Sequence, residues 1–237
     1  ILYKNKINDL NNEIDCIQFI KHDICSLYPN TVGRKNAFLI EEVLLDLKSN
    51  KPILQNGLSL LIRAKNEEEN IIACIESVVD LVDEIIFVNN NSSDQTLSII
   101  EKLSLQYNHI KVYNYFIDVP RAGKDHQEAV KKNNKNTLGT YYNWCLSKST
   151  MKHVIKWDAD FICIRNNFQQ MIRDYKIKEK KNNYSLWFTG STLFIHNDVH
   201  FLKLNSYYNE FRLFSNEYGF QWYDGEFCEY VEPFTQK

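Results

Sequence analysis

Two aspartates separated by one residue, Asp158 and Asp160, follow the apolar run His153–Trp157. In open α/β sheets ligands bind beyond the carboxyl ends of the strands. Two carboxylates spaced by one residue at a strand end point the same way. This arrangement suits a hard divalent cation, which takes oxygen ligands and commonly bridges to a diphosphate. A solvated turn is the ordinary alternative for an isolated Asp-x-Asp. The position directly after a strand favours a metal site.

Polar residues also follow two earlier apolar runs, at Arg63–Glu67 and at Asn89–Asp94. Strands must position these polar residues, and the apolar runs of the sequence predict four strands. Helical patterns lie between the strands, which indicates a mainly parallel sheet in an α/β domain. The predicted strands are Leu58–Ile62, Glu84–Val88, His109–Tyr113 and His153–Trp157.

Capping residues predict where two of the helices begin. Asn66 is a candidate N-cap, with Glu67–Glu69 in the first turn, where the helix dipole favours anions. Ser92 and Gln95 have the spacing of a capping box for the next helix. We expect Asp94 to have a structural role at the same helix start.

The polar stretch from Asp118 to Thr137 interrupts this alternation and predicts a mobile loop. Its basic residues could close over a diphosphate as a lid, or they could form a solvated basic loop. A helix is predicted after it, near Thr140–Ser147.

Residues 1–56 form a separate pattern. Apolar residues recur at helical spacing from Ile7 to Ile20 and from Ile40 to Leu47. We expect a helical extension that packs on the main domain or belongs to a preceding module, and a main domain at 57–237. The extension could be a dimer arm, a membrane-surface contact or a linker. Because the chain begins at Ile1, we interpret it as a segment of a longer protein.

Composition excludes several classes of protein. The chain has 237 residues, 44% hydrophobic and 24% charged, with a net charge of -2. These values are typical of a globular protein, and the chain lacks the excess of Lys and Arg expected of a general nucleic-acid binder. No apolar run approaches the ~20 residues of a membrane span. The six cysteines have neither a C-x-x-C pair nor zinc spacing, so we expect reduced, buried thiols in a cytoplasmic protein.

Five segments, in order, resemble family 2 glycosyltransferases of the GT-A fold, over about residues 58–233. The resemblance is to the branch that adds sugars to lipopolysaccharide core and related glycans. It implies a Rossmann-like, mainly parallel mixed sheet flanked by helices. The segments are Leu60–Glu68 with Cys74–Ser77, Glu84–Thr96, Asn143–Leu146, Asp158–Asp160, and Arg212–Phe214 followed by Tyr223–Glu229.

Carried over by position, the resemblance implies a donor site. Ala64 and Glu67 would line the nucleoside pocket. Asn89 stands where the family usually has an Asp that recognises the base or the ribose, and an Asn can both donate and accept hydrogen bonds. Asp158 would contact the ribose or the water shell of the metal, and Asp160 would ligate Mn²⁺ or Mg²⁺ on the diphosphate.

Family 2 enzymes invert the anomeric carbon, so a carboxylate should deprotonate the acceptor hydroxyl. The resemblance favours Glu229 as this base, with Asp224 as the second choice, and Glu226 lies in the same acidic cluster. Cys228 replaces the usual His. A thiol is a poor partner for Mg²⁺, so the metal would rely on Asp160 and the diphosphate.

The resemblance therefore predicts an inverting, metal-dependent hexosyltransferase that uses a nucleotide sugar, with a UDP-sugar as the first choice. The acceptor would be a glycan or a lipid-linked saccharide in surface polysaccharide synthesis. The enzyme would be cytoplasmic, with a peripheral membrane contact or neighbouring domains as options. A catalytically silent module that binds a glycan or a partner is the alternative. A nucleotidyltransferase is disfavoured, because Lys65–Glu69 lacks the Gly-rich loop of that class.

Overall fold

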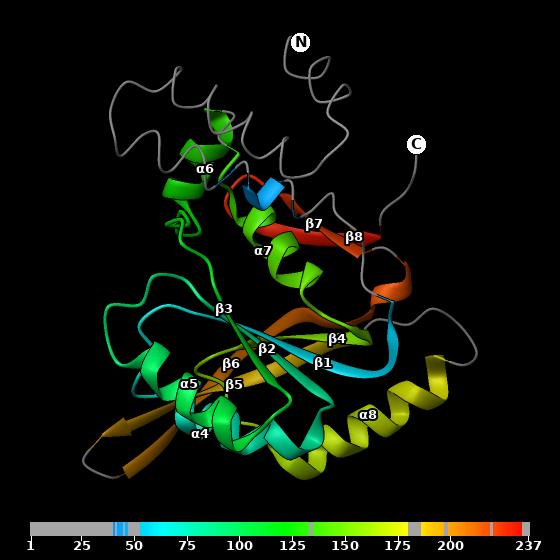
Figure 1. Ribbon diagram of the computed structural model, residues 1–237. Helices are drawn as coiled ribbons and strands as arrows, with labels where there is room; N and C mark the ends of the chain where they lie inside the picture. The colour runs from blue at the N-terminus through cyan, green and yellow to red at the C-terminus, as the bar shows by residue number, and fades with distance from the viewer. Residues whose placement is uncertain are drawn as a thin grey trace.

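The computed structural model contains one six-stranded sheet, a separate two-stranded hairpin and helices on both faces of the sheet (Figure 1). The fold places the predicted donor-site residues near the carboxyl ends of the parallel strands. The residues that the structure describes are 40, 42–44, 46, 53–132, 135–179, 186–196, 199–218 and 220–233.

The strand order in the sheet is β3-β2-β1-β4-β6-β5. The first four strands of the chain run parallel to one another, whereas β6 is antiparallel to both β4 and β5. The bounds are β1 Gln55–Ala64, β2 Glu84–Asn89, β3 Ile110–Asn114, β4 Met151–Asp158, β5 Leu186–His196 and β6 Val199–Ser215, with β7 Phe220–Asp224 and β8 Glu229–Pro233 forming the hairpin. The prediction of a mainly parallel, mixed sheet is confirmed.

Helices α4, α5 and α8 cover one face of the sheet, and α7 with the β7–β8 hairpin covers the other (Figure 1). Short 3₁₀ helices follow α4 and β6, at Val79–Leu81 and Asn216–Tyr218. No helix of the described residues has the length and hydrophobicity to cross a bilayer. The α-helices are α4 Ile71–Val78, α5 Thr96–Gln106, α6 Lys124–Lys131, α7 Leu138–Ser147 and α8 Arg165–Glu179.

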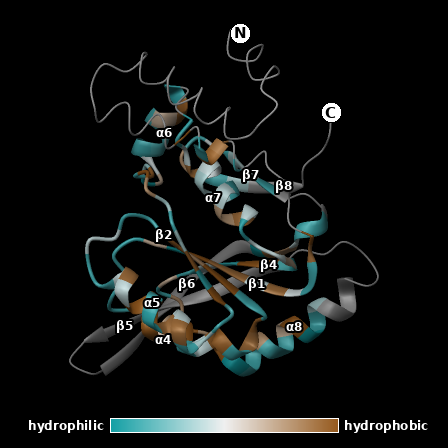
Figure 2. Ribbon diagram, in the orientation of Figure 1, coloured by the Kyte–Doolittle hydropathy of each residue, from teal (hydrophilic) through white to brown (hydrophobic). Residues whose placement is uncertain are grey.

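The central strands are apolar on both sides because both faces are covered (Figure 2). Leu60 and Ile62 of β1 pack toward α4 and α5 in one buried cluster. Leu61 of the same strand packs with Trp144 of α7 and Trp222 of β7 in the other cluster. The continuous apolar runs of the sequence therefore mark a sheet with helices on both faces.

The predicted start of the first helix is wrong. Helix α4 begins at Ile71, and Glu67–Glu69 precede it in a turn. Asn66 has a φ of 59°, in the left-handed region. An N-cap residue needs an extended backbone, so Asn66 instead turns the chain sharply away from β1.

The predicted Ser92–Gln95 capping box is also wrong, because α5 begins four residues after Ser92, at Thr96. Asp94 has the structural role that the sequence predicted. Its Oδ1 accepts a hydrogen bond from the Thr96 backbone N–H at 2.9 Å, and its Oδ2 accepts one from the Glu68 N–H at 3.1 Å.

The stretch predicted as a mobile loop, 118–137, contains helix α6. The helix is held by the turn between β7 and β8: His126 is fully buried, and its Nε2 lies 3.2 Å from the Gly225 carbonyl oxygen. The Gly123 N–H donates to the Phe227 carbonyl at 2.5 Å. This docking explains why a polar, lysine-rich stretch is ordered.

Most of the predicted N-terminal extension lies outside the described residues. Residues 40, 42–44 and 46 are helical, in agreement with the predicted helix at Ile40–Leu47. Val43 is buried in the cluster under α7, and Asp46 forms an ion pair with Lys148, the residue directly after α7. This part of the extension packs on the main domain. The division at residue 56 stays a prediction.

A buried carboxylate joins three strands at the amino end of the sheet. Glu84 is 1% exposed and accepts hydrogen bonds from Ser59 Oγ at 2.5 Å, from Lys111 Nζ at 2.5 Å and from the Thr150 backbone and hydroxyl. Burial alone would raise the pKa of Glu84, but these hydrogen bonds outweigh it and lower the pKa below the ordinary 4.5.

We expect Glu84→Gln to lower the free energy of unfolding at pH 7 by about 1–3 kcal/mol, because buried donors lose their acceptor. Since the native pKa of Glu84 lies below its unfolded value, its contribution is complete above the unfolded pKa and is lost as the pH falls through the native pKa. Urea unfolding of both proteins from neutral to acidic pH measures this. A difference between them that does not shrink on acidification would contradict the assignment.

Candidate active site

The parallel register brings the predicted site residues to one edge of the sheet. Strands β1, β2 and β4 end at Ala64, Asn89 and Asp158. Ala64 pairs with Asn89, and Arg63 pairs with Asp158. We call this line of strand ends the carboxyl edge.

The turn after β1 is fastened to the start of α5. The Glu67 backbone N–H donates to Thr96 Oγ1 at 2.7 Å, and Thr96 is fully buried. Asn66 Oδ1 accepts from the Ser93 N–H at 2.8 Å, and the Asn66 N–H donates to Ser92 Oγ at 3.0 Å. The position of Glu67 is thus fixed through its backbone N–H, and its carboxylate accepts a hydrogen bond from Asn70 Nδ2 at 3.1 Å.

Negative charge accumulates around Glu67. The pKa of this carboxyl is raised, first by burial and then by repulsion from Asp160, Asp94 and Asp158, while a hydrogen bond from Asn70 opposes the shift. Asp160 is exposed in the turn after β4. An edge with this charge favours a cation. Among the described residues, no group of three or more His, Cys, Asp or Glu side chains could hold a metal ion.

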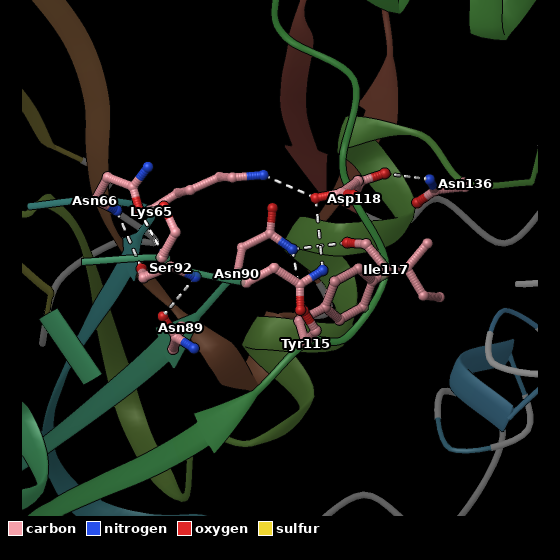
Figure 3. A network of polar contacts seen from close by, with 11 residues as sticks. Lys65, Asn66, Asn89, Asn90, Ser92, Tyr115, Ile117, Asp118 and Asn136 are labelled. Carbon is pink, nitrogen blue, oxygen red and sulfur yellow. Dashed lines mark hydrogen bonds and ion pairs between the residues drawn. The ribbon is translucent and has the colours of Figure 1, made fainter. Parts of the chain in front are cut away.

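Asn89 is 4% exposed, and its amide is bonded within the protein. Nδ2 donates to Asn114 Oδ1 at 2.9 Å, and Oδ1 accepts from the Ser92 N–H at 3.3 Å. Asn90 Nδ2 donates to the carbonyls of Tyr115 and Ile117, at 3.1 and 2.7 Å. The two side chains therefore support the turn after β2, as Figure 3 shows.

The same network reaches the segment that leads to α6 (Figure 3). Lys65 Nζ forms an ion pair with Asp118 at 2.7 Å, and Asn136 Nδ2 donates to the Asp118 carbonyl at 2.7 Å. The Lys65–Asp118 pair lowers the pKa of Asp118. Lys65 is half exposed, so this contact can open without unpacking the core.

Asp158 lies between two buried arginines. Arg212 is fully buried and donates to Asp158 Oδ2 at 2.8 Å, while Arg63 Nη2 lies 3.9 Å from Oδ1. Burial would raise the pKa of Asp158, but the Arg212 hydrogen bond and the charges of Arg212, Arg63 and Lys156 outweigh it and lower the pKa. Asp158 is therefore ionised at neutral pH and already has one strong partner.

The three predicted base candidates occupy different places. Glu229 is 9% exposed and pairs with Lys156 of β4 at 3.2 Å, two residues before Asp158. Asp224 Oδ1 accepts from the Gly139 N–H at 2.8 Å, at the start of α7. Glu226 accepts from Gln127 of α6 at 2.8 Å. The structure thus brings Glu229 onto the face of β4 that also carries Asp158, whereas the other two hold helices in place.

Sequence reasoning placed Arg63 at a strand end without giving it a role, and it missed Lys156. Arg63 and Lys156 interrupt the apolar runs of β1 and β4 close to the carboxyl edge. Both lie over the ring of Tyr142, with the guanidinium carbon at 3.7 Å and the ammonium nitrogen at 5.4 Å from its centroid. A charged residue near the end of an otherwise buried strand was the signal that could have found them.

Residues 59–115 match the family model described as Glycosyl transferase family 2. The predicted family resemblance is confirmed. The match covers β1 to β3 and less than half of the chain, and it includes Ala64, Glu67 and Asn89 of the predicted donor site. No curated protein sequence matches the chain.

Several solved structures are similar at low identity. S. aureus TarS 1-349 has 20% identity over 54% of this chain and 33% of its own, with a TM-score of 0.39. The mannosyltransferase PcManGT from Pyrobaculum calidifontis, in complex with GDP-Man and Mn²⁺, has 13% identity over 67% and 44%, with a TM-score of 0.37. Glucosyl-3-phosphoglycerate synthase from Mycobacterium tuberculosis, with Mg²⁺ and UDP, has 23% identity over 52% and 38%, with a TM-score of 0.31. The chain thus spans less than half of each of these proteins.

We expect Asp94→Ala to lower the free energy of unfolding by about 1 kcal/mol, because the first turn of α5 loses its cap. Asp94→Asn keeps one acceptor oxygen and should lose less. Urea unfolding of the two variants and the unchanged protein gives the comparison. Equal stability of all three would show that Asp94 does not cap the helix.

Proposed function

We propose that this chain carries the donor-binding and catalytic domain of an inverting, metal-dependent glycosyltransferase. The observation that carries the proposal is the convergence of Ala64, Glu67, Asn89, Asp158 and Asp160 at one edge of a sheet whose first three strands match the family model. The donor is a nucleotide sugar, with UDP as the first choice of nucleotide. The acceptor is a glycan or a lipid-linked saccharide of a surface polysaccharide.

The residues at the carboxyl edge fit a divalent cation. Asp160 is exposed, and the pKa of Glu67 beside it is raised, first by burial and then by repulsion from Asp160, Asp94 and Asp158. Because Asp158 already accepts a hydrogen bond from Arg212, Asp160 is the direct ligand and Asp158 contacts the ribose or the water shell. When bound, Mn²⁺ or Mg²⁺ supplies Lewis-acid stabilisation of the leaving diphosphate.

The base in this proposal is Glu229, with Asp224 and Glu226 as the alternatives. Lys156 holds the Glu229 carboxylate on the face of the sheet that carries Asp158. A carboxylate so placed can accept the proton of an acceptor hydroxyl as that oxygen attacks the anomeric carbon. Asp224 instead contacts the start of α7, and Glu226 contacts α6.

A silent module that binds a glycan or a partner is the second candidate. Asn89 favours it, because its amide is bonded to Asn114 and Ser92 rather than presented to a ligand. Nucleotide binding separates the two candidates, since only the transferase needs a donor.

We expect one of UDP, GDP, CDP and ADP, together with Mn²⁺, to raise the thermal unfolding midpoint of the full chain. A ligand at 100 times its dissociation constant adds about 2.7 kcal/mol, which is a shift of roughly 5–10 °C for a protein of this size. Asp160→Asn should lose the Mn²⁺-dependent part of the shift. Asp174→Asn, on the exposed side of α8, is the matched control and should keep it.

A midpoint that no nucleotide raises, with or without Mn²⁺, would overturn the donor site and favour the silent module. An equal shift in Asp160→Asn would show that this carboxylate does not hold the metal.

A further inference from the structure

Arg63 is a buried cation with incomplete charge compensation. Its side chain is 6% exposed. Its Nη1 is buried and makes no hydrogen bond within the described part of the chain. The nearest carboxylate is Asp158, at 3.9 Å from Nη2, which is beyond hydrogen-bond distance. Asp158 itself is bonded to Arg212 at 2.8 Å.

The surroundings of Arg63 do not supply the missing charge. Tyr142 stacks under its guanidinium, and Cys145 lies nearby in α7. Burial raises the pKa of the Cys145 thiol to about 12 and also raises that of the Tyr142 hydroxyl, so both groups are neutral at physiological pH. A ring face attracts a cation but does not replace a countercharge.

Among the described residues of the wider cluster, Arg212 pairs with Asp158 and Lys156 pairs with Glu229. Arg63 has only the long contact with Asp158. Removing a charge from water without a partner costs folding free energy. A guanidinium presents fixed N–H groups that match the oxygens of a phosphate or a carboxylate. An anionic oxygen group is therefore the partner that fits.

We propose that Arg63 binds an anionic group, a phosphate or a carboxylate, that the acceptor substrate carries. This inference rests on the proposed glycosyltransferase function. The cluster lies on the face of the sheet under α7, where Arg63 and Lys156 both lie over the ring of Tyr142. Lys156 pairs there with the proposed base Glu229. The acidic residues Glu67 and Asp160, by contrast, form the side of the edge assigned to the metal and the donor diphosphate.

An anion would enter the cluster beside Asp158, which is the most exposed of its five residues. Its side chain is 37% exposed, whereas Arg63, Lys156, Arg212 and Glu229 are buried or nearly so. The Arg63–Asp158 contact is long, and an incoming anion can open it while the shorter Arg212–Asp158 bond stays in place. The acceptor would then be fixed beside the base by a charge-assisted hydrogen bond.

The test measures thermal stabilisation by inorganic phosphate and by acetate, each with and without saturating UDP and Mg²⁺. The unchanged protein should be stabilised by at least one of the two anions in a saturable manner, and to the same extent when UDP is bound. Arg63→Met keeps the length of the side chain but removes the charge. It should weaken the apparent affinity for the anion about tenfold or more, a loss typical of a charge-assisted hydrogen bond.

Arg165→Met is the matched control, because Arg165 forms an exposed ion pair with Asp80 and should leave anion binding unchanged. If Arg63→Met fails to fold, Arg63→Lys is the substitute: it keeps the charge but lacks the planar guanidinium, and it should weaken anion binding less. The phosphate and acetate titrations of the unchanged protein test the proposal in either case. No saturable stabilisation by either anion, or equal affinity in the Arg63 variant, would overturn the proposal.

Competition between UDP and the anion would overturn the acceptor assignment, because the subsite would then belong to the donor diphosphate. The outcome that would overturn the proposed function differs from the one that would overturn the Arg63 subsite. If no nucleotide binds, the transferase and the acceptor assignment both fall, whereas nucleotide binding without anion binding contradicts the Arg63 subsite alone.

Discussion

The hydrogen bond between Arg212 and Asp158 is the interaction on which the candidate site depends. Arg212 comes from the antiparallel part of the sheet and is fully buried, so its charge needs a carboxylate in contact. That carboxylate is the last residue of β4, a parallel strand. The bond therefore fastens β6 to the end of β4, whose other neighbour in the sheet is β1. It also divides the carboxyl edge into an acidic side with Glu67 and Asp160 and a cationic side with Arg63 and Lys156.

The parallel half of the fold can be predicted from the sequence because short-range patterns determine it. Apolar runs of strand length alternate with helical spacing, and parallel strands place their carboxyl ends together. These two facts bring Ala64, Asn89 and Asp158 to one edge without any knowledge of side-chain contacts. The structural role of Asp94 is of the same kind, because a cap acts on its immediate neighbours.

The remaining features depend on contacts between distant segments. The left-handed backbone of Asn66 is held by Ser92 and Ser93, which are 26 and 27 residues away, so local capping rules placed α4 too early. Helix α6 is ordered by the β7–β8 turn, and only its polar composition was visible beforehand. The contact of Arg63 with Tyr142, and its incomplete pairing with Asp158, needed the packing of α7 on the sheet. Sequence spacing gives no access to such contacts.

We propose that the carboxyl edge holds a nucleotide diphosphate through a metal at Asp160. Anomalous X-ray diffraction from crystals of the full chain grown with UDP and Mn²⁺ tests it most directly. We expect a manganese peak beside the Asp160 carboxylate, with the uridine toward the ends of β1 and β2 and with Arg212 still bonded to Asp158. A manganese peak away from this edge, or a nucleotide bound elsewhere on the chain, would contradict it.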